Sequence, residues 1–388
     1  MFLGGVERSL VGLLEAFDYS QYDVDLFLLR HEGELLKYIP DEVNLLPEVK
    51  QYTVLARPMV DTLKEGHILL TLCRLYGKLK SKIYIKQHHH TESEVPIDYS
   101  HKYTYKLMPF INKDKDYDLA ISFLTPHYIV SHKVNAKKKI AWIHTDYDYI
   151  QTNKISQLSM WGNYDYIASI SEAVTNNFVK NFPELAGKVI EIPNVLPVKL
   201  INKQANEFDV GDEMIEDGSL KLLSIGRYCE QKNFDNIPFI SRKLLELGLN
   251  FKWYIIGFGS DEGRIIESIK KCHMEDYVIL LGKKSNPYPY IKACDIYIQP
   301  SRYEGKCVSV IEAQSLHKPV IITNYPTAKS QLKDGYDGMI VPMENEKCAS
   351  RIQQIVTNGQ LLDTMRQNCC KEDYSKYSEV QKIYKIIS

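Results

Sequence analysis

The sequence lacks a Cys-x-x-Cys pair, an apolar run long enough to cross a membrane and an excess of either charge. Its eight cysteines are scattered over 388 residues, which favours reduced thiols over a disulfide framework and leaves Cys369–Cys370 open as a redox pair. A net charge of −1 excludes a global basic field for nucleic acid. The first residues show no basic region, apolar core and cleavage site of a signal peptide. We therefore expect a cytoplasmic protein.

The sequence also offers little to hold a metal ion or a redox cofactor. The adjacent histidines 88–90 cannot all point toward one ion from a single strand or loop. No Asp-x-Asp pair stands in a matching context. After Gly257 and Gly259, the third glycine of a dinucleotide fingerprint is replaced by Glu262. We therefore expect no metal and no cofactor.

What is present is a repeated alternation of apolar strands and helical patterns, with 44% hydrophobic and 25% charged residues. This pattern is typical of α/β proteins, and the chain is long enough for two domains. The pattern breaks between residues 202 and 217, where Asn, Gln, Asp and Glu dominate. We therefore predict two domains at 1–196 and 219–370 and a final helix at 371–388.

The apolar run Asp295–Gln299 and the stretch from Pro300 to Thr323 together predict a strand, loop, helix and strand joined by a right-handed crossover. Glu304 and Gly305 fall in the loop at the carboxyl end of the first strand, where open α/β sheets bind ligands. The following helix points free N–H groups at this place, which suits a phosphate. Glu312 lies on that helix, eight positions after Glu304, so the pair suggests a sugar nucleotide. A surface-loop Glu and an unrelated helix-face Glu remain the alternative.

A second pair of polar residues follows the apolar strand 220–225. Arg227 and Lys232 stand five residues apart just beyond its carboxyl end. Arg offers a planar fork and Lys a point charge, so together they can straddle a diphosphate.

These motifs resemble those of the retaining glycosyltransferases of family 4. The segment matches their Glu-x7-Glu signature, including the preceding Pro300–Ser301 and the following Ala313 and Pro319–Val320. Residues 226–233 resemble the Gly-Arg-x4-Lys-Asn motif of the same family. One departure is that Lys306 and Cys307 stand where the family usually has an aromatic or small residue and then Gly or Pro. The resemblance implies the GT-B architecture, two Rossmann-like domains facing across a cleft.

The resemblance also implies roles for individual residues. Glu304 would hold the hydroxyls of the donor sugar, and His144, at the end of a buried strand, would contact that sugar from the first domain. For His144 the alternatives are capping the strand or pairing with Asp146 or Asp148. The remaining residues implied to bind the donor are Gly4, Gly5, Arg227, Lys232, Gly305, Lys306, Cys307, Val308 and, at the ribose, Glu312. Gly4–Gly5 could equally be a simple turn that opens a helix.

The implied reaction moves a hexosyl group, with retention, from a nucleoside diphosphate sugar to a hydroxyl of a glycan or lipid-linked acceptor. UDP is the commonest donor nucleotide of this family, and bacterial surface polysaccharide synthesis is the expected context. The first domain would bind the acceptor, the second the donor, and the last helix would cross back to the first domain. Two alternatives are a non-catalytic nucleotide-sugar-binding subunit and a nucleotide-sugar epimerase, for which we find no acid and His set.

The segment from Arg74 to Lys86 carries basic and apolar residues without an acid. It overlaps the end of a predicted helix at 59–79, and its pattern is typical of a surface that contacts an anionic membrane. We therefore expect peripheral contact with the inner face of the membrane. A solvated basic loop beside a buried helix is the alternative.

Overall fold

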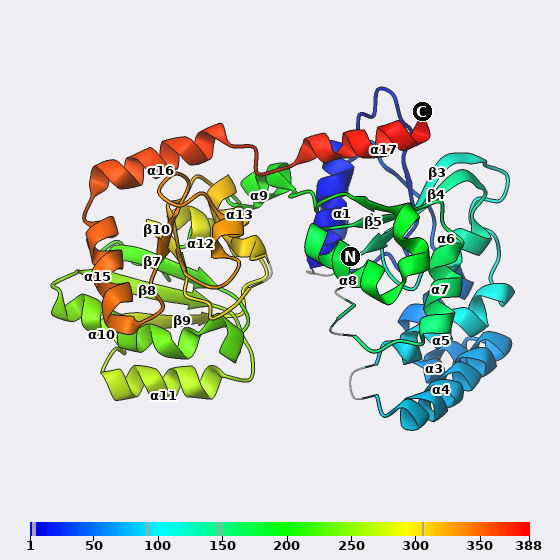
Figure 1. The fold of residues 1–388 in the computed structure, drawn as a ribbon, viewed down its shortest axis with the longest axis horizontal. Helices are drawn as coiled ribbons and strands as arrows, with labels where there is room; N and C mark the ends of the chain where they lie inside the picture. Colours follow the sequence, from blue (N-terminus) through cyan, green and yellow to red (C-terminus); the bar gives the residue numbers. More distant parts are fainter. Residues whose placement is uncertain (2–4, 91–92, 146, 149, 305) are drawn as a thin grey trace. The chain divides into compact units, whose positions relative to one another are not determined.

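Two α/β units make up the chain in a computed structural model, which describes residues 1, 5–90, 93–145, 147–148, 150–304 and 306–388. Unit 1 comprises Met1–Leu196 and Lys376–Ser388, and unit 2 comprises Pro197–Ser375. Each unit contains a parallel sheet flanked by helices (Figure 1). The predicted α/β fold class is thereby confirmed.

Unit 1 is organised around a four-stranded parallel sheet in the order β3-β4-β5-β6, and a separate pair of short strands, β1 and β2, lies outside it. Its strands are β1 (Asp25–Leu26), β2 (Asn44–Leu45), β3 (Tyr117–Ser122), β4 (Ala136–Ile143), β5 (Tyr166–Ser169) and β6 (Val189–Glu191). Its α-helices are α1 (Gly5–Ala16), α2 (Lys50–Thr53), α3 (Met59–Lys64), α4 (Ile68–His88), α5 (Val95–Thr104), α6 (Tyr128–Lys133), α7 (Lys154–Gly162), α8 (Glu172–Asn181) and α17 (Val380–Ile387). Short 3-10 helices are η1 (Leu36–Tyr38), η2 (Val54–Ala56), η3 (Tyr105–Leu107), η4 (Pro183–Lys188) and η7 (Tyr377–Glu379).

The final helix of the chain packs on unit 1, as predicted. Its apolar residues recur at helical spacing, so Val380, Ile383 and Ile386 are buried together with Trp142 of β4 and Leu13 of α1. The helix proper begins at Val380 rather than at residue 371. Residues 371–375 belong to unit 2 instead, because α16 continues to Lys371.

Unit 2 is built on a six-stranded parallel sheet in the order β12-β11-β10-β7-β8-β9. Its strands are β7 (Leu220–Ile225), β8 (Phe251–Ile256), β9 (Val278–Gly282), β10 (Ile296–Gln299), β11 (Val320–Thr323) and β12 (Met339–Val341). Its α-helices are α9 (Val198–Gln204), α10 (Ile237–Glu246), α11 (Glu262–Cys272), α12 (Tyr288–Ala293), α13 (Val308–Ser315), α14 (Ala328–Gln331), α15 (Asn345–Val356) and α16 (Gly359–Lys371). The 3-10 helices are η5 (Glu230–Lys232) and η6 (Phe234–Asn236).

The strands of unit 2 are apolar on both faces, as buried parallel strands must be. Leu222, Trp253 and Ile298 belong to one core cluster with apolar side chains of α10, α11, α15 and α16. Two glycines after β8 permit a close backbone approach. A Cβ on Gly257 would lie 1.9 Å from the carbonyl oxygen of Gly226, and one on Gly259 would lie 2.3 Å from that of Tyr228. The Gly-x-Gly sequence therefore serves packing beside the loop that follows β7.

The helix predicted at 59–79 is wrong in its extent. It is divided into α3 and α4 at Gly66, whose positive φ of 84° ends the first helix. The basic segment from Arg74 to Lys86 lies entirely within α4, so the alternative of a basic loop is wrong as well. Within the described residues, no helix combines the length and apolar character needed to span a bilayer.

Candidate active site

All strands of the unit 2 sheet are parallel, and the order in which they follow one another changes direction between β7 and β10. These strands are neighbours, with β8 and β9 on one side and β11 and β12 on the other. Such a switch point at the carboxyl ends of parallel strands is the usual ligand site of an open α/β sheet. The loops after β7 and β10 are joined there. Asn233 donates its side-chain N–H to the carbonyl of Pro300 (2.8 Å), and the Arg302 N–H donates to the Gln231 carbonyl (2.9 Å).

A buried ion pair connects the same two loops. Lys232 Nζ donates to Glu304 Oε1 at 2.7 Å, and the two side chains are only 14% and 5% exposed. Ser301 Oγ donates to the same carboxylate oxygen at 2.6 Å, while Gln231 Nε2 donates to Oε2 at 3.1 Å. Three donors therefore fix the orientation of the Glu304 carboxylate. A fixed orientation suits a group that binds a ligand in one geometry.

The third member of this cluster is Cys307. Lys232 Nζ lies 3.6 Å from its Sγ, and Ser309 Oγ lies 3.2 Å from the same sulfur. Burial raises the pKa of the Cys307 thiol, although the charge of Lys232 opposes this shift. Burial alone would lower the pKa of Lys232, but Cys307 and Glu304 outweigh it and raise that pKa. Lys232 is therefore a firmly charged ammonium, and two of its three N–H donors are directed at Glu304 and Cys307.

The amino terminus of α13 lies directly after this cluster. Cys307 is its N-cap residue, and its N–H donates to Gln331 Oε1 at 2.7 Å, so this N–H is used within the protein. Val308 begins the helix with its side chain 45% exposed, and Lys306 is exposed before it. Gly305 lies outside the described residues. The positive end of the helix dipole nevertheless adds to the charge of Lys232.

Glu312 lies on α13, about one helical turn after Val308, and is 3% exposed. Its Oε1 accepts a hydrogen bond from the hydroxyl of Tyr288 at 2.8 Å. Glu304 and Glu312 are thus held by different partners in unit 2, the first by a cation and the second by a phenol.

Arg227 stands at the other edge of the loop after β7, and its side chain is exposed. Gly226 before it leaves room for the stem of Lys232, since a Cβ there would lie 3.0 Å from Lys232 Cε. The glycine thus allows Lys232 to reach back over the end of β7 to Glu304. Arg227 and Lys232 come from one loop, but only Lys232 is bound into the cluster.

His144 lies in unit 1, at the carboxyl end of β4. Its ring packs against Phe123, with centroids 4.6 Å apart, and runs nearly parallel to Trp142. Neither ring nitrogen makes a well-formed hydrogen bond to a described residue. The pairing of His144 with Asp148, one alternative from the sequence, is therefore not seen. Asp146, the other residue considered, lies outside the described residues. Burial, which outweighs a weak backbone contact with Phe123, lowers the pKa of His144 to about 4. The ring is therefore neutral near pH 7.

This pKa predicts a pH-dependent stability. The folded pKa lies below the ordinary value of 6.5, so the unfolded chain binds a proton that the folded chain does not. The stabilisation is complete above about pH 6.5 and is lost as the pH falls toward about 4. Urea unfolding near pH 7 and near pH 5 should show a larger loss for the wild type than for His144→Asn. Equal losses would mean that His144 is not buried in neutral form.

The other predicted residues of unit 1 are placed as follows. Gly5 begins α1 and is exposed, while Gly4 lies outside the described residues. Arg74 does not belong to a basic surface, and this part of the prediction is wrong. Its guanidinium is turned inward and donates to the carbonyls of Val54 and Arg57. Of the basic segment, the lysines 78, 80, 82 and 86 are exposed.

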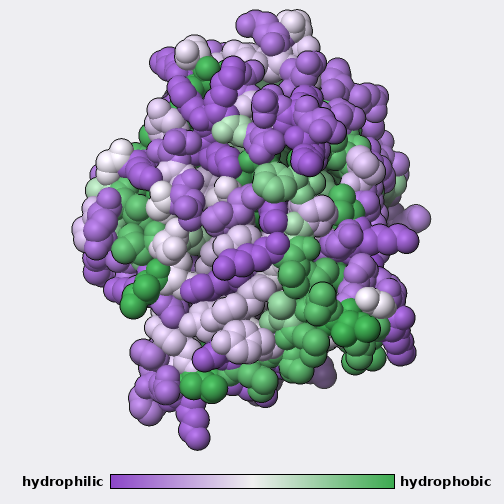
Figure 2. Space-filling view, turned by 90° about the vertical axis from the view of Figure 1, so that its right-hand side faces the viewer, coloured by the Kyte–Doolittle hydropathy of each residue, from purple (hydrophilic) through white to green (hydrophobic). Residues whose placement is uncertain are grey.

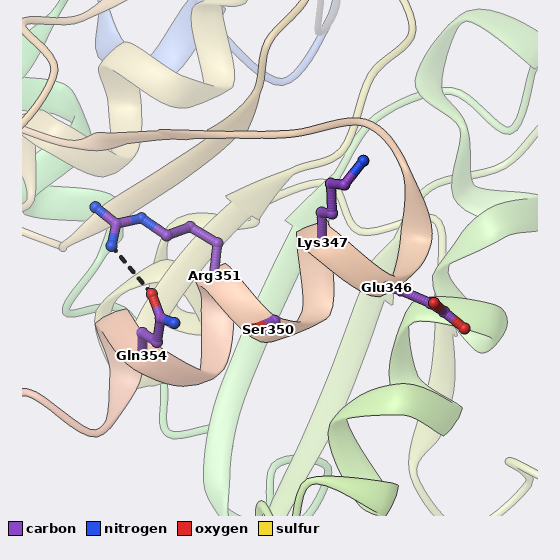
Figure 3. Close-up of a pocket in the computed structure, with 5 residues that line it drawn as sticks. All are labelled: Glu346, Lys347, Ser350, Arg351 and Gln354. Carbon is purple, nitrogen blue, oxygen red and sulfur yellow. Dashed lines mark hydrogen bonds between the residues drawn. The ribbon is translucent and has the colours of Figure 1, made fainter.

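An open pocket on α15 does not coincide with this site. It is lined by Glu346, Lys347, Ser350, Arg351 and Gln354. Figure 3 shows all five on successive turns of one helix, with Arg351 bonded to Gln354. A single mostly exposed helix face brings no groups together from different elements, and we assign it no role.

Sequence reasoning missed the residues that hold the cluster in place. Gln231 and Ser301 orient Glu304, and Gln331 of α14 brackets Cys307 by accepting from its N–H and donating to its carbonyl at 3.2 Å. Gln231 and Ser301 lie within the two motifs of the sequence analysis, so their positions were a usable signal. Gln331 is 24 residues from Cys307 in the sequence, and no local pattern pointed to this contact.

Part of the chain is similar to known glycosyltransferases. Residues 206–372 match the family model of glycosyl transferases group 1. An uncharacterized glycosyltransferase of Methanocaldococcus jannaschii is 28% identical over 60% of this chain and 61% of its own length. The N-acetylgalactosamine-N,N'-diacetylbacillosaminyl-diphospho-undecaprenol 4-alpha-N-acetylgalactosaminyltransferase of Campylobacter jejuni is 26% identical over 50% of this chain and 51% of its own length. The chain thus spans only about half to three-fifths of these curated relatives.

A solved structure shares the fold over nearly the whole chain. The Anabaena protein HepE, in complex with UDP, superposes with a TM-score of 0.59 over 98% of this chain and 95% of its own. The sequences are 14% identical, so this likeness concerns the fold alone.

Proposed function

Residues 206–372 match the family model of glycosyl transferases group 1, and from this premise we propose that the chain is a retaining, metal-independent hexosyltransferase. Its donor is a nucleoside diphosphate sugar. The observation that carries the proposal is the buried ion pair of Lys232 and Glu304 at the switch point of the sheet. It places a cation and an oriented carboxylate side by side at the amino terminus of α13.

Unit 2 binds the donor in this proposal. Arg227 and Lys232 contact the diphosphate, Lys232 through the N–H that is not directed at Glu304 or Cys307. The amino terminus of α13 at Val308 adds positive potential. Glu304 accepts hydrogen bonds from the sugar hydroxyls, and Glu312 accepts from the ribose. UDP is the proposed nucleotide, supported by the family resemblance and by the UDP bound to HepE.

The chemical step exchanges one bond for another at the anomeric carbon. The acceptor oxygen forms a bond to that carbon on the face from which the phosphate leaves. The carbon–phosphate oxygen bond breaks, and the hydroxyl proton passes to a phosphate oxygen. Preorganised positive charge stabilises the diphosphate as it leaves. His144, kept neutral by its low pKa, contacts the sugar as a hydrogen-bonding group without adding charge.

The acceptor in this proposal is a hydroxyl of a glycan or of a lipid-linked sugar, bound by unit 1. The name of the Campylobacter jejuni relative describes an acceptor linked to diphospho-undecaprenol, and this supports an acceptor of the same class. Synthesis of a bacterial surface polysaccharide is the context we propose.

The test is to incubate the purified chain with UDP-sugars and short glycosyl acceptors and to follow UDP release, transfer and the configuration of the product. The proposal expects UDP release that rises with a suitable acceptor, and an unchanged anomeric configuration. Donor binding without release or transfer would instead identify a non-catalytic binding subunit. Interconversion of the sugar without release of UDP would identify an epimerase.

A further inference from the structure

The helix α4 presents its apolar residues outward. The residues that it buries are Leu70 and Thr71 at its start and the small Gly77 and Ser81 further along. Gly77 lies so close to α5 that a Cβ would meet the Tyr99 carbonyl oxygen at 2.8 Å. The close packing of α4 on α5 therefore requires small residues on the inner face and leaves the large apolar residues on the outer one.

The outer face carries a continuous apolar stripe, which we call the α4 stripe. It consists of Ile68, Leu69, Leu72, Leu75, Tyr76, Leu79 and Ile83, with exposures of 56%, 68%, 54%, 44%, 49%, 53% and 53%. Their spacing of three, four and seven residues puts them on one side of the helix. The contacting helix α3 also exposes two large apolar residues, Val60 at 63% and Leu63 at 51%. Figure 2 shows hydrophobic residues gathered low on this face, at the height of α3 and α4 in Figure 1.

Lysines border the α4 stripe on both sides. At 100° per residue, Lys78 and Lys82 fall on one edge and Lys80 on the other, with Lys86 beyond the last apolar residue. All four are exposed, and the 21 residues of α4 contain no Asp or Glu. The α4 stripe is complementary to an apolar layer, and the lysines on both sides of it are complementary to anionic groups at the surface of that layer. The helix carries no acid that would oppose this binding.

We propose that α4 binds in the plane of an anionic lipid bilayer, with the α4 stripe inserted among the acyl chains and the lysines at the phosphate level. The helix is about 31 Å long, and its inner face is packed on α5, so it lies along the surface and does not cross. A second copy of the chain fits less well, because pairing two such stripes would bring lysines of both copies together. This proposal differs from simple electrostatic contact and does not depend on the proposed donor chemistry.

Flotation with phosphatidylcholine vesicles, with and without phosphatidylglycerol, tests it. The wild type should float with the anionic vesicles and remain bound in part at high salt, because insertion is apolar. The triple change Leu72→Gln, Leu79→Gln and Ile83→Gln should lower the partition coefficient by about tenfold or more. Ile155→Gln on α7, where the residue is 84% exposed, is the matched control and should change nothing. All four positions are exposed, so circular dichroism should find each variant folded.

A second set of variants separates insertion from charge. Changing Lys78, Lys80 and Lys82 to Gln should weaken binding to anionic vesicles and leave the weak binding to neutral ones unchanged. Three results would overturn the proposal: a wild type that never floats with anionic vesicles, a triple Gln variant of the stripe that floats like the wild type, or complete release by salt. A wild-type dimer in light scattering that the stripe variant turns into a monomer would assign the stripe to a second copy instead.

Discussion

Replacing Glu304 by Gln should reduce the rate of sugar transfer by more than about tenfold, which is about 1.4 kcal/mol of transition-state stabilisation. The amide has the shape of the carboxylate and can still accept from Lys232 and Ser301, so the loop should persist. What is lost is the negative charge that accepts from the sugar hydroxyls. Affinity for free UDP should hardly change, because UDP carries no hexose. Steady-state rates and titration calorimetry with UDP measure the two effects.

Two further variants make this result specific. Asp295→Asn changes a carboxylate at the opposite end of β10, where it accepts from the Lys221 N–H, and should leave transfer unchanged apart from stability. Glu312→Gln should instead weaken UDP, since its proposed partner is the ribose. If UDP affinity collapses with Glu304→Gln and survives with Glu312→Gln, the two roles are reversed. If both variants transfer at the wild-type rate, the pair is structural.

Lys232→Met should weaken UDP binding by about 1.5–3 kcal/mol, the usual contribution of a charge-assisted hydrogen bond. It should also lower the free energy of unfolding, because Glu304 would remain buried without its cation; breaking such a pair costs about 3–5 kcal/mol. Arg227→Ala should weaken UDP without this loss, since Arg227 is exposed. Calorimetric titration of each variant measures its affinity for UDP, and urea unfolding measures its free energy of unfolding.

The matched control for this variant is Lys221→Met. Lys221 is also buried, with its side chain 6% exposed against 14% for Lys232, but it lies at the amino end of β7 and pairs with Glu216. Both Met variants should lose stability, and only Lys232→Met should lose UDP affinity. Unchanged affinity in the variants of both Arg227 and Lys232 would remove the diphosphate assignment.

The parallel sheets and the two donor-site loops could be predicted because their signals are local. Apolar runs such as 220–225 and 295–299 have the length and composition of buried strands, and both were found as β7 and β10. The carboxyl ends of neighbouring parallel strands meet at one edge of a sheet, so Lys232 and Glu304 could be expected near each other although 72 residues separate them. The order of strands that makes β7 and β10 neighbours came from the structure.

What could not be predicted depends on contacts between distant residues. Arg74 has the sequence context of a surface cation, but the carbonyls of Val54 and Arg57 satisfy it inside the unit. Cys307 was expected to bind the donor at the start of a helix with free N–H groups, and the structure directs its own N–H to Gln331. The outward direction of the apolar residues of α4 follows from its packing on α5. A periodicity of 3.6 identifies an apolar face but not whether the fold covers it.

Calorimetric titration of the wild-type chain with UDP and with uridine tests the central claim most directly. In the proposed function, cations at the switch point of unit 2 bind a diphosphate. UDP should therefore bind, and uridine, which has the base and ribose but no phosphate, should bind at least about tenfold more weakly, a difference of about 1.4 kcal/mol. Equal affinities, or no binding of UDP together with none of GDP or ADP, would contradict it.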